Sequence, residues 1–199
     1  MEQPVSMAED DTTQGFLQRE IILRNASSND IEAIAALHAD SWRRHYRGAF
    51  SDAFLDGEVV AERRMIWSER LTATNANHFT LVADRNGEVV GFVHMILDKD
   101  PDWGALLDNL HVAYQLKRYG IGRRLLTAAA RELTRCRPTD TRFYLWVIDQ
   151  STAAQTFYRE CGGRDAEISL HEHGPFPGGS CVLSHRMAWS DAAILGQLL

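Results

Sequence analysis

Hydrophobic and polar positions alternate along the chain in two rhythms, the two-residue period of strands and the longer period of helices. The run EIILR, residues 20–24, is short and rich in apolar side chains, so it predicts a first strand. Residues 27–46 follow with Asn29 as the expected N-cap and Glu32 three residues later, which predicts an amphipathic helix. The apolar positions at helical spacing are Ile31, Ile34, Ala35, Leu37 and Trp42.

The run HFTLVADRNGEVVGFVHMIL gives the clearest local signal in the chain. Asn86 and Gly87 lie between its two β-rich halves, and this pair readily adopts the positive φ angles of a tight hairpin turn. A second helix is predicted before the hairpin, over residues 59–71, after an irregular break. A third strand is predicted to begin near Trp103, because Pro101 would interrupt a hydrogen-bonded ladder.

The second half of the chain continues the alternation. IGRRLLTAAARELTRC predicts a helix with one apolar face, and RFYLWVID predicts a strand buried on both faces. A short helix follows, capped by the serine or threonine at its start and ended by Gly162 and Gly163, before AEISL and CVLSHRMAW as two last strands. This order predicts a single α/β domain over residues 20–199, after a loose polar tail over residues 1–19.

Composition and charge narrow the classes of function. The 199 residues are 45% hydrophobic and 24% charged, as in an ordinary soluble globular protein. The formal net charge of -6 disfavours a dedicated nucleic-acid binder and leans towards a cationic substrate. The three cysteines lack C-x-x-C spacing, so we expect reduced thiols. The sequence shows neither a leader pattern nor an apolar run that could span a membrane, so we expect a cytoplasmic protein without membrane contact.

A glycine pair at the start of the third predicted helix is the first candidate for chemistry. Gly120 and Gly122 remove side chains that would block close approach, and the helix dipole adds positive charge at this end. These features predict a pyrophosphate site, with a plain tight turn as the alternative. Neither G-K-S/T nor G-x-G-x-x-G is present, which disfavours nucleoside triphosphates and dinucleotides. The flanking cations are Lys117, Arg118, Arg123 and Arg124.

The sequence KRYGIG, residues 117–122, resembles the phosphate loop Q/R-x-x-G-x-G/A of the GCN5-related N-acetyltransferase (GNAT) family, with lysine at the first position. LWVIDQSTAAQTFYRECGG is similar to a strand followed by that family's N-x-x-A-x-x-F-Y motif, with Ser151 at the asparagine position. The resemblance covers residues 20–189. It implies the acyl-CoA N-acyltransferase fold, an α/β arrangement with a mixed, twisted sheet of six to seven strands and about four helices. It also implies an N-acetyltransferase that uses acetyl-CoA as its donor.

The same resemblance assigns residues to the donor. It implies that the fourth and fifth strands separate to receive the pantetheine arm, with backbone groups of Leu110 and Val112 pairing with that arm. It implies that amides from Arg118 to Arg123 hold the pyrophosphate and that Tyr158 protonates the departing CoA thiolate. The full set implied at the acetyl-CoA site is Leu110, His111, Val112, Lys117, Arg118, Tyr119, Gly120, Ile121, Gly122, Arg123, Ser151 and Ala154.

Direct acetyl transfer to an amine also needs a base and a donor that polarises the thioester carbonyl. A backbone N–H at or beside Leu110 is expected to polarise the carbonyl. Asp108, His94 and His111 stay open as the base, and a water relay is a further alternative. The acceptor is expected to be a small-molecule or peptide amine, although aromatic side chains at such spacing also pack in cores. The candidate acceptor-binding residues are Trp42, Tyr46, Trp103 and Asn109.

The C-terminal part adds two histidines and a loop. His171 and His173 have no third ligand in view and make a poor metal site, so we expect no metal. The loop from Gly174 to Gly179 is predicted to act as a flap over the acceptor pocket. A homodimer stays open as the assembly. The rival function is a non-catalytic acyl-CoA-binding regulatory module that keeps the glycine loop but lacks turnover.

Overall fold

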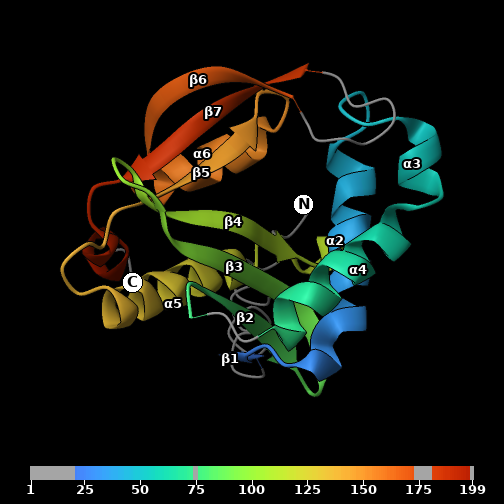
Figure 1. Cartoon of the computed structure of the whole chain (residues 1–199), viewed down its shortest axis with the longest axis horizontal. Helices are drawn as coiled ribbons and strands as arrows, with labels where there is room; N and C mark the ends of the chain where they lie inside the picture. Colours follow the sequence, from blue (N-terminus) through green and yellow to red (C-terminus); the bar gives the residue numbers. More distant parts are fainter. Residues whose placement is uncertain (1–20, 74–75, 173–180, 198–199) are drawn as a thin grey trace, which may run out of the picture.

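The computed structural model describes residues 21–73, 76–172 and 181–197, and Figure 1 shows their arrangement. Seven strands form one sheet in the order β1-β2-β3-β4-β5-β7-β6, with β4 and β5 parallel and every other neighbouring pair antiparallel. This confirms the mixed α/β sheet. The predicted tail, residues 1–19, lies outside the described residues.

The strands are β1 (Ile21–Asn25), β2 (His78–Arg85), β3 (Glu88–Asp100), β4 (Gly104–Val112), β5 (Phe143–Ile148), β6 (Arg164–Glu172) and β7 (Cys181–Trp189). The α-helices are α2 (Ile31–His45), α3 (Asp52–Asp56), α4 (Val59–Thr72), α5 (Ile121–Cys136) and α6 (Thr152–Glu160). Three short 3₁₀ helices are η1 (Ser28–Asp30), η2 (Tyr114–Leu116) and η3 (Ala192–Gln197). Among the described helices, none has the length and apolarity that a membrane crossing needs.

The start of α2 corrects one prediction. Asn29 is not the N-cap: it lies inside η1, and Ser27 and Asp30 form the capping box instead. The Asp30 carboxylate accepts a hydrogen bond from the Ser27 backbone N–H at 2.7 Å, and Arg24 on β1 donates to its two oxygens at 2.8 and 2.9 Å. This ion pair ties the helix start to β1 and lowers the pKa of Asp30. The aspartate therefore takes the role expected of the asparagine.

The predicted hairpin and the predicted second helix are both present. The β2–β3 hairpin is confirmed, with φ angles of 54° at Asn86 and 89° at Gly87. The second helix is confirmed as α4, which ends one residue later than predicted. The irregular break before it contains the short helix α3, which the sequence pattern did not indicate. Its N-cap is Ser51, whose side chain accepts a hydrogen bond from the Phe54 backbone N–H.

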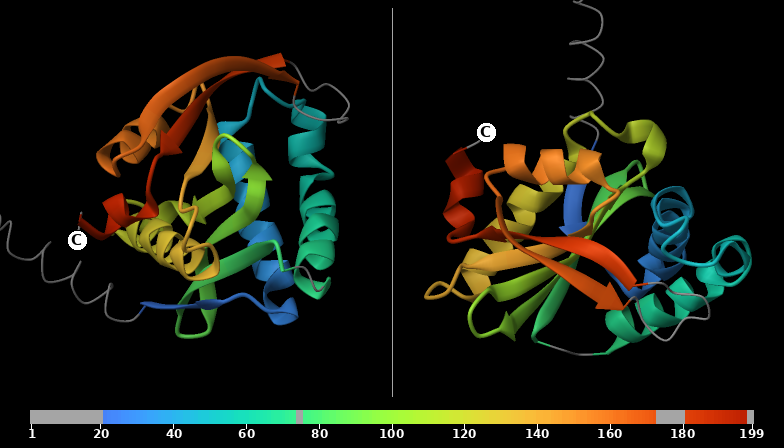
Figure 2. Two further views of the ribbon diagram at one scale, coloured as in Figure 1. Left: turned by 60° about the vertical axis from the view of Figure 1, so that its left-hand side comes forward. Right: turned by 90° about the horizontal axis from the view of Figure 1, so that it is seen from above.

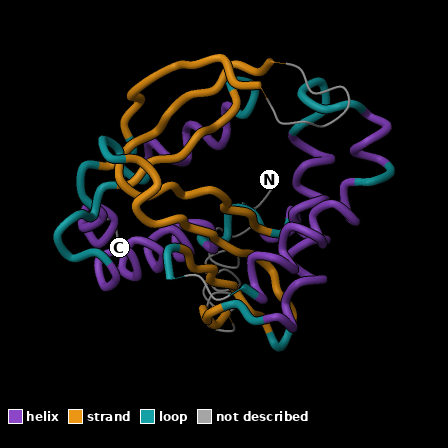
Figure 3. The backbone as a smooth tube through the Cα atoms, in the orientation of Figure 1, coloured by secondary structure: helices purple, strands orange, loops and turns teal. Residues whose placement is uncertain are grey.

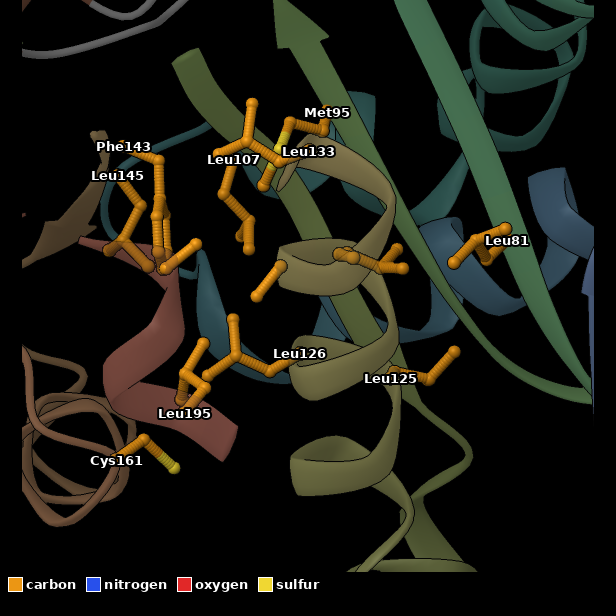
Figure 4. Close-up of a cluster of buried hydrophobic side chains, with 14 of the residues drawn as sticks. Leu81, Met95, Leu107, Leu125, Leu126, Leu133, Phe143, Leu145, Cys161 and Leu195 are labelled. Atoms are coloured by element: carbon orange, nitrogen blue, oxygen red, sulfur yellow. The ribbon is translucent and has the colours of Figure 1, made fainter. Parts of the chain in front are cut away.

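Helices cover the first half of the sheet on both faces, as the two views of Figure 2 show. Trp67 of α4 and Ile34 of α2 pack against Phe92 on one face of β3. On the other face, α5 buries its apolar side against strands β2 to β5, and Figure 4 shows this main core. Figure 3 shows α2, α3 and α4 grouped at one side of the molecule, apart from β6 and β7. Two layers of helices therefore enclose the sheet half that leads into β4.

Strands β4 and β5 pair only at their beginnings. Ala105 pairs with Phe143 and Leu106 with Tyr144, and beyond this point β5 continues beside β7 rather than β4. A bulge marks the same place on the other edge of β4, because His94 pairs with Asn109 while Met95 pairs with Leu107. Asp108 is the residue that this bulge leaves without a partner position on β3. The separation of the fourth and fifth strands, implied by the resemblance, is thus present.

Candidate active site

A cavity of about 440 Å³ lies where β4 and β5 separate, between the ends of these strands and helices α2 and α4. Of the residues predicted for donor, acceptor and catalysis, those that line it are Trp42, Tyr46, Asp108, Asn109, Leu110, His111, Val112, Lys117, Ser151, Ala154 and Tyr158. Predicted residues outside its lining are His94, Trp103, Arg118, Tyr119, Gly120, Ile121, Gly122 and Arg123. The structure therefore brings the strand residues and both helix α6 positions together, and it places the glycine loop beside them.

The glycine loop leads from β4 into α5 next to the Lys117 end of the cavity. Gly120 is the N-cap of α5 with a φ of 77°, and Arg118 has a φ of 71°. The left-handed conformation explains why glycine stands at position 120, since a Cβ would be strained there. The start of a 16-residue helix directs N–H groups and the positive end of its dipole out of this loop. The loop therefore has the backbone geometry that a phosphate group needs.

Lys117 connects this loop to α2. Its Nζ lies 3.0 Å from Nε2 of His45, and Nδ1 of His45 lies 2.8 Å from the Ser41 carbonyl oxygen. A protonated lysine donates to Nε2, so the histidine proton sits on Nδ1 and is donated to Ser41. Gln150, in the loop after β5, donates to the His45 carbonyl oxygen at 2.7 Å. The end of α2 is thus bonded to the loops that follow both separated strands, and partial burial lowers the pKa of Lys117.

Two tyrosines face the same cavity. Tyr158 of α6 is only 8% exposed, and its ring packs edge-on against Phe157 and Trp189. Burial, followed by the charge effects of Tyr46 and Cys161, raises the pKa of Tyr158 above its ordinary value. Burial and the Asp108 carboxylate raise the pKa of Tyr46 to about 12. Both phenols are therefore protonated at neutral pH and can donate a proton or a hydrogen bond.

The three candidate bases have different surroundings. Asp108 lines the cavity at the bulge of β4, and its Oδ2 accepts from Arg70 Nη1 at 2.8 Å and from Asn109 Nδ2 at 2.5 Å. His111 also lines the cavity, but burial and nearby positive charges lower its pKa to about 3. His94 is 1% exposed, bonds Thr80 at 2.8 Å and stays outside the cavity lining. Asp108 is the candidate that combines charge with access to the cavity.

Trp103 does not line the cavity, because its ring packs on an arginine of β7. It belongs to the β3–β4 turn, and its ring covers the guanidinium of Arg186 on β7 at 4.7 Å from the ring centroid. Tyr144 and Trp146 of β5 cover the same guanidinium at 4.8 and 4.5 Å. Trp103 therefore takes part in a structural cation–π cluster, and we leave it, like His94, out of the proposed site.

Several lining residues were missed by the sequence analysis. Arg63 of α4 stacks on the Trp42 ring at 4.0 Å from its centroid and is paired with Glu62, and Arg70 pairs with Asp108. The sequence held one signal that Arg63 points inward, because it lies four residues from both Val59 and Trp67 on the buried stripe of α4. The missed lining residues with polar or aromatic side chains are Ser41, His45, Phe50, Arg63, Arg70 and Trp146.

The proposed flap, residues 174–179, and His173 lie outside the described residues, and so does the side chain of His171. Elsewhere in the described ranges, no group of three or more histidine, cysteine, aspartate or glutamate side chains is placed to hold a metal ion. Cys136, Cys161 and Cys181 are free thiols.

Comparison with known proteins gives one family match. The model of the acetyltransferase (GNAT) family matches residues 32–163. An uncharacterised N-acetyltransferase of Bacillus subtilis, YuaI, is 26% identical over 181 residues, which cover 90% of this chain and 98% of the relative.

Solved structures agree with this match at the level of the fold. The PaiA N-acetyltransferase of Thermoplasma acidophilum, in complex with coenzyme A, has a TM-score of 0.61 and 18% identity, covering 83% of this chain and 97% of that one. YncA of Salmonella typhimurium, a putative acetyltransferase with its cofactor acetyl-CoA, has a TM-score of 0.61 and 18% identity, covering 85% of this chain and 93% of that one.

Proposed function

Because this chain belongs to the acetyltransferase (GNAT) family, it is an N-acetyltransferase, and we propose that it transfers an acetyl group from acetyl-CoA directly to a small-molecule or peptide amine. The observation that carries this proposal is the cavity between β4 and β5, which Lys117 lines beside the glycine loop and Tyr158 lines from α6. The Thermoplasma and Salmonella structures, which hold coenzyme A and acetyl-CoA, support the choice of donor. We further propose one domain over residues 20–199, a cytoplasmic location and no resident metal; a homodimer stays a prediction.

Donor binding is assigned to three parts of the chain. The start of α5 and Lys117 would hold the pyrophosphate through N–H groups and one positive charge. The edge of β4 from Leu110 to Val112, which β5 leaves uncovered, would pair with the pantetheine arm. Ser151 and Ala154 at the start of α6 would flank the arm from the β5 side.

The chemistry needs one proton taken and one proton given. Acetyl-CoA supplies the acetyl group as a thioester. The amine nitrogen of the acceptor bonds to the carbonyl carbon, the carbon–sulfur bond breaks, and the CoA thiol is released. Asp108, held at the bulge of β4 by Arg70, would take the proton that the amine loses. Tyr158 would give its phenolic proton to the sulfur and regain one from solvent. A backbone N–H at or beside Leu110 would polarise the carbonyl.

Release of the CoA thiol tests the function. Full-length protein is incubated with acetyl-CoA and a panel of amines, and both the free thiol and the acetylated product are measured. We expect thiol release that depends on the amine, with one product molecule formed per thiol. Binding of acetyl-CoA without amine-dependent release would instead favour the non-catalytic module.

Replacing Lys117 with alanine should weaken donor binding. The loss of one charge at the pyrophosphate end should raise the KM for acetyl-CoA about tenfold, while kcat falls less than about twofold. Lys117→Arg is the matched control and should keep KM within about twofold, because the charge remains. A fall in kcat at constant KM would contradict the assignment of Lys117 to donor binding.

The same pair of variants gives a pH test. The pKa of Lys117 is lowered by burial, with a further contribution from Arg44, so this lysine loses its proton at a lower pH than an exposed lysine. As pH rises towards that lowered pKa, the KM for acetyl-CoA of the wild type should rise. Lys117→Arg should show no such rise, because arginine stays protonated. Parallel KM profiles for the two proteins between pH 7 and about 10 would exclude this role.

A further inference from the structure

We propose that the acceptor is an amine that also carries a carboxylate, as a free amino acid does, and that Arg63 and Arg70 of α4 bind this carboxylate. The proposal rests on the N-acetyltransferase function above and names its substrate class. It differs from the lean towards a cationic substrate that the net charge of -6 suggested. Charges at the cavity, rather than the total charge, decide which substrate is held there.

The cavity lining carries more positive than negative side chains. Among the described residues that line it, Arg63, Arg70 and Lys117 are permanently or normally cationic, and Asp108 is the one carboxylate. Lys117 lies at the glycine-loop end and is assigned to the donor. The two arginines are therefore left to the acceptor end, opposite a single acid.

Each arginine is oriented by a carboxylate that leaves part of its guanidinium for a ligand. Glu62 is bonded to Nε and Nη2 of Arg63 and does not itself line the cavity, so Nη1 lies outside this ion pair. Trp42 stacks against the same guanidinium and fixes its plane. Arg70 is bonded to Asp108 through Nη1 at 2.8 Å. A planar guanidinium held in this way can bind a planar carboxylate through two parallel hydrogen bonds, and it repels a second cation.

The histidines around the cavity respond to the same positive field. Burial is the largest cause that lowers the pKa of His111, and the electrostatic effects of His45, Lys117 and Arg63 lower it further. His38, packed between Trp42 and His111, has its pKa lowered by burial and then by His111, Arg63 and Arg70 among its neighbours. Both imidazoles are therefore neutral and do not add positive charge. An entering carboxylate would share Arg70 with Asp108 and would meet Arg63 at Nη1, the atom that Glu62 does not bond.

The contact between Arg70 and Asp108 also places the two proposed subsites side by side. Asp108, the proposed base, is in direct contact with Arg70, so the amine that Asp108 deprotonates lies close to the guanidinium. An ammonium near Asp108 and a carboxylate near Arg70 and Arg63 describe a molecule whose two charged groups are a few bonds apart. Trp42, Tyr46 and Phe50 form a stacked aromatic wall beside them, which suits an apolar side chain.

Matched acceptors test the proposal in the thiol-release assay. The panel pairs L-leucine with leucinamide and isoamylamine, and adds a lysine-rich peptide, an acidic peptide with a free N-terminus, and aminoethyl phosphate. We expect kcat/KM for leucine to exceed that for leucinamide by about 30-fold, the size of a charge-assisted hydrogen-bond pair. Equal rates for leucine and leucinamide, or a preference for the lysine-rich peptide or the phosphate, would overturn the proposal. A preference for the acidic peptide over leucine would overturn the proposal that the acceptor is a free amino acid, but it would support the carboxylate site at the two arginines.

Variants locate the preference on α4. Arg70→Gln, and the double variant Glu62→Gln with Arg63→Gln, should each reduce the leucine preference to about threefold or less. The double variant removes both members of a buried pair, so no buried charge is left alone. Arg64→Gln is the control, because Arg64 is exposed on the same helix and paired with Glu32. A preference that survives in both site variants would overturn the assignment to these arginines.

A binding measurement separates this proposal from the function itself. Calorimetry on the wild-type protein with CoA bound compares leucine and leucinamide without turnover, and leucine should bind about 30-fold more tightly. No thiol release with any amine would contradict the N-acetyltransferase function. Release with amines that lack a carboxylate, at rates equal to leucine, would contradict only the substrate class.

Discussion

Replacing Tyr158 with phenylalanine is expected to lower kcat by about 100- to 1000-fold, the usual contribution of a positioned general acid. Tyr158 lines the cavity from α6, and its phenol is the protonated group assigned to the leaving thiolate. Phenylalanine keeps the ring that packs against Phe157 and Trp189, so stability and the KM for acetyl-CoA should change little. Steady-state kinetics with acetyl-CoA and a good acceptor measure the loss, and unchanged turnover would exclude the acid role.

The pH profile adds a second readout for Tyr158. Its pKa is raised by burial, so the acid form, which the reaction needs, persists through neutral and mildly alkaline pH. Ionisation of Tyr158 should therefore cause no fall in kcat below pH of about 10. A fall in the wild type near pH 8 that vanishes in the phenylalanine variant would contradict the shift.

Tyr46→Phe is the matched comparison, because Tyr46 is a buried phenol in the same cavity with its pKa raised to about 12. Its hydroxyl is assigned to the acceptor side, so we expect less than about a tenfold loss in kcat/KM, through the acceptor KM. If Tyr46→Phe abolished turnover and Tyr158→Phe did not, the acid role would pass to Tyr46.

Local signals were enough to predict much of the fold. Three features depend only on residues close together in sequence, and all three are confirmed: the Asn86-Gly87 turn, the apolar face of α5 and the end of α6 at Gly162. The capping of α2 was predicted wrongly because Asp30 forms an ion pair with Arg24 on the preceding strand, β1. An ion pair between residues six positions apart leaves no mark on hydrophobic periodicity.

The sequence offered motif-based candidates for the donor side of the site and only scattered candidates for the acceptor side. The donor residues lie in two short motifs, so resemblance could carry them. Arg63 and Arg70 reach the cavity only because α4 folds over β3 and faces the bulge at Asp108. Trp103 was predicted on the acceptor side; it lies in the β3–β4 turn, where its ring covers Arg186 and is outside the cavity lining. These placements depend on tertiary packing, which the sequence pattern does not contain.

Gly104→Ala should be the most damaging single change to stability, with a loss of about 2–4 kcal/mol in the free energy of unfolding. Gly104 begins β4 with a φ of 79°, and a Cβ there would lie 2.3 Å from the Arg142 carbonyl oxygen. That oxygen accepts the Ala105 N–H at 3.0 Å, beside the two positions where β4 pairs with β5. A methyl group must therefore push apart the strands whose controlled separation forms the cavity. Urea unfolding measures the loss.

Gly48→Ala separates the two causes. Gly48 also has a positive φ, 83°, but an added Cβ would meet no atom within 4 Å, so only backbone strain of about 1 kcal/mol is expected. The difference between the variants is the steric cost at the β4–β5 junction. Since the junction sets how β4 leaves β5, the folded fraction of Gly104→Ala should also show a raised KM for acetyl-CoA, while Gly48→Ala should not. Equal losses of stability in the two variants would show that contact with Arg142 contributes nothing.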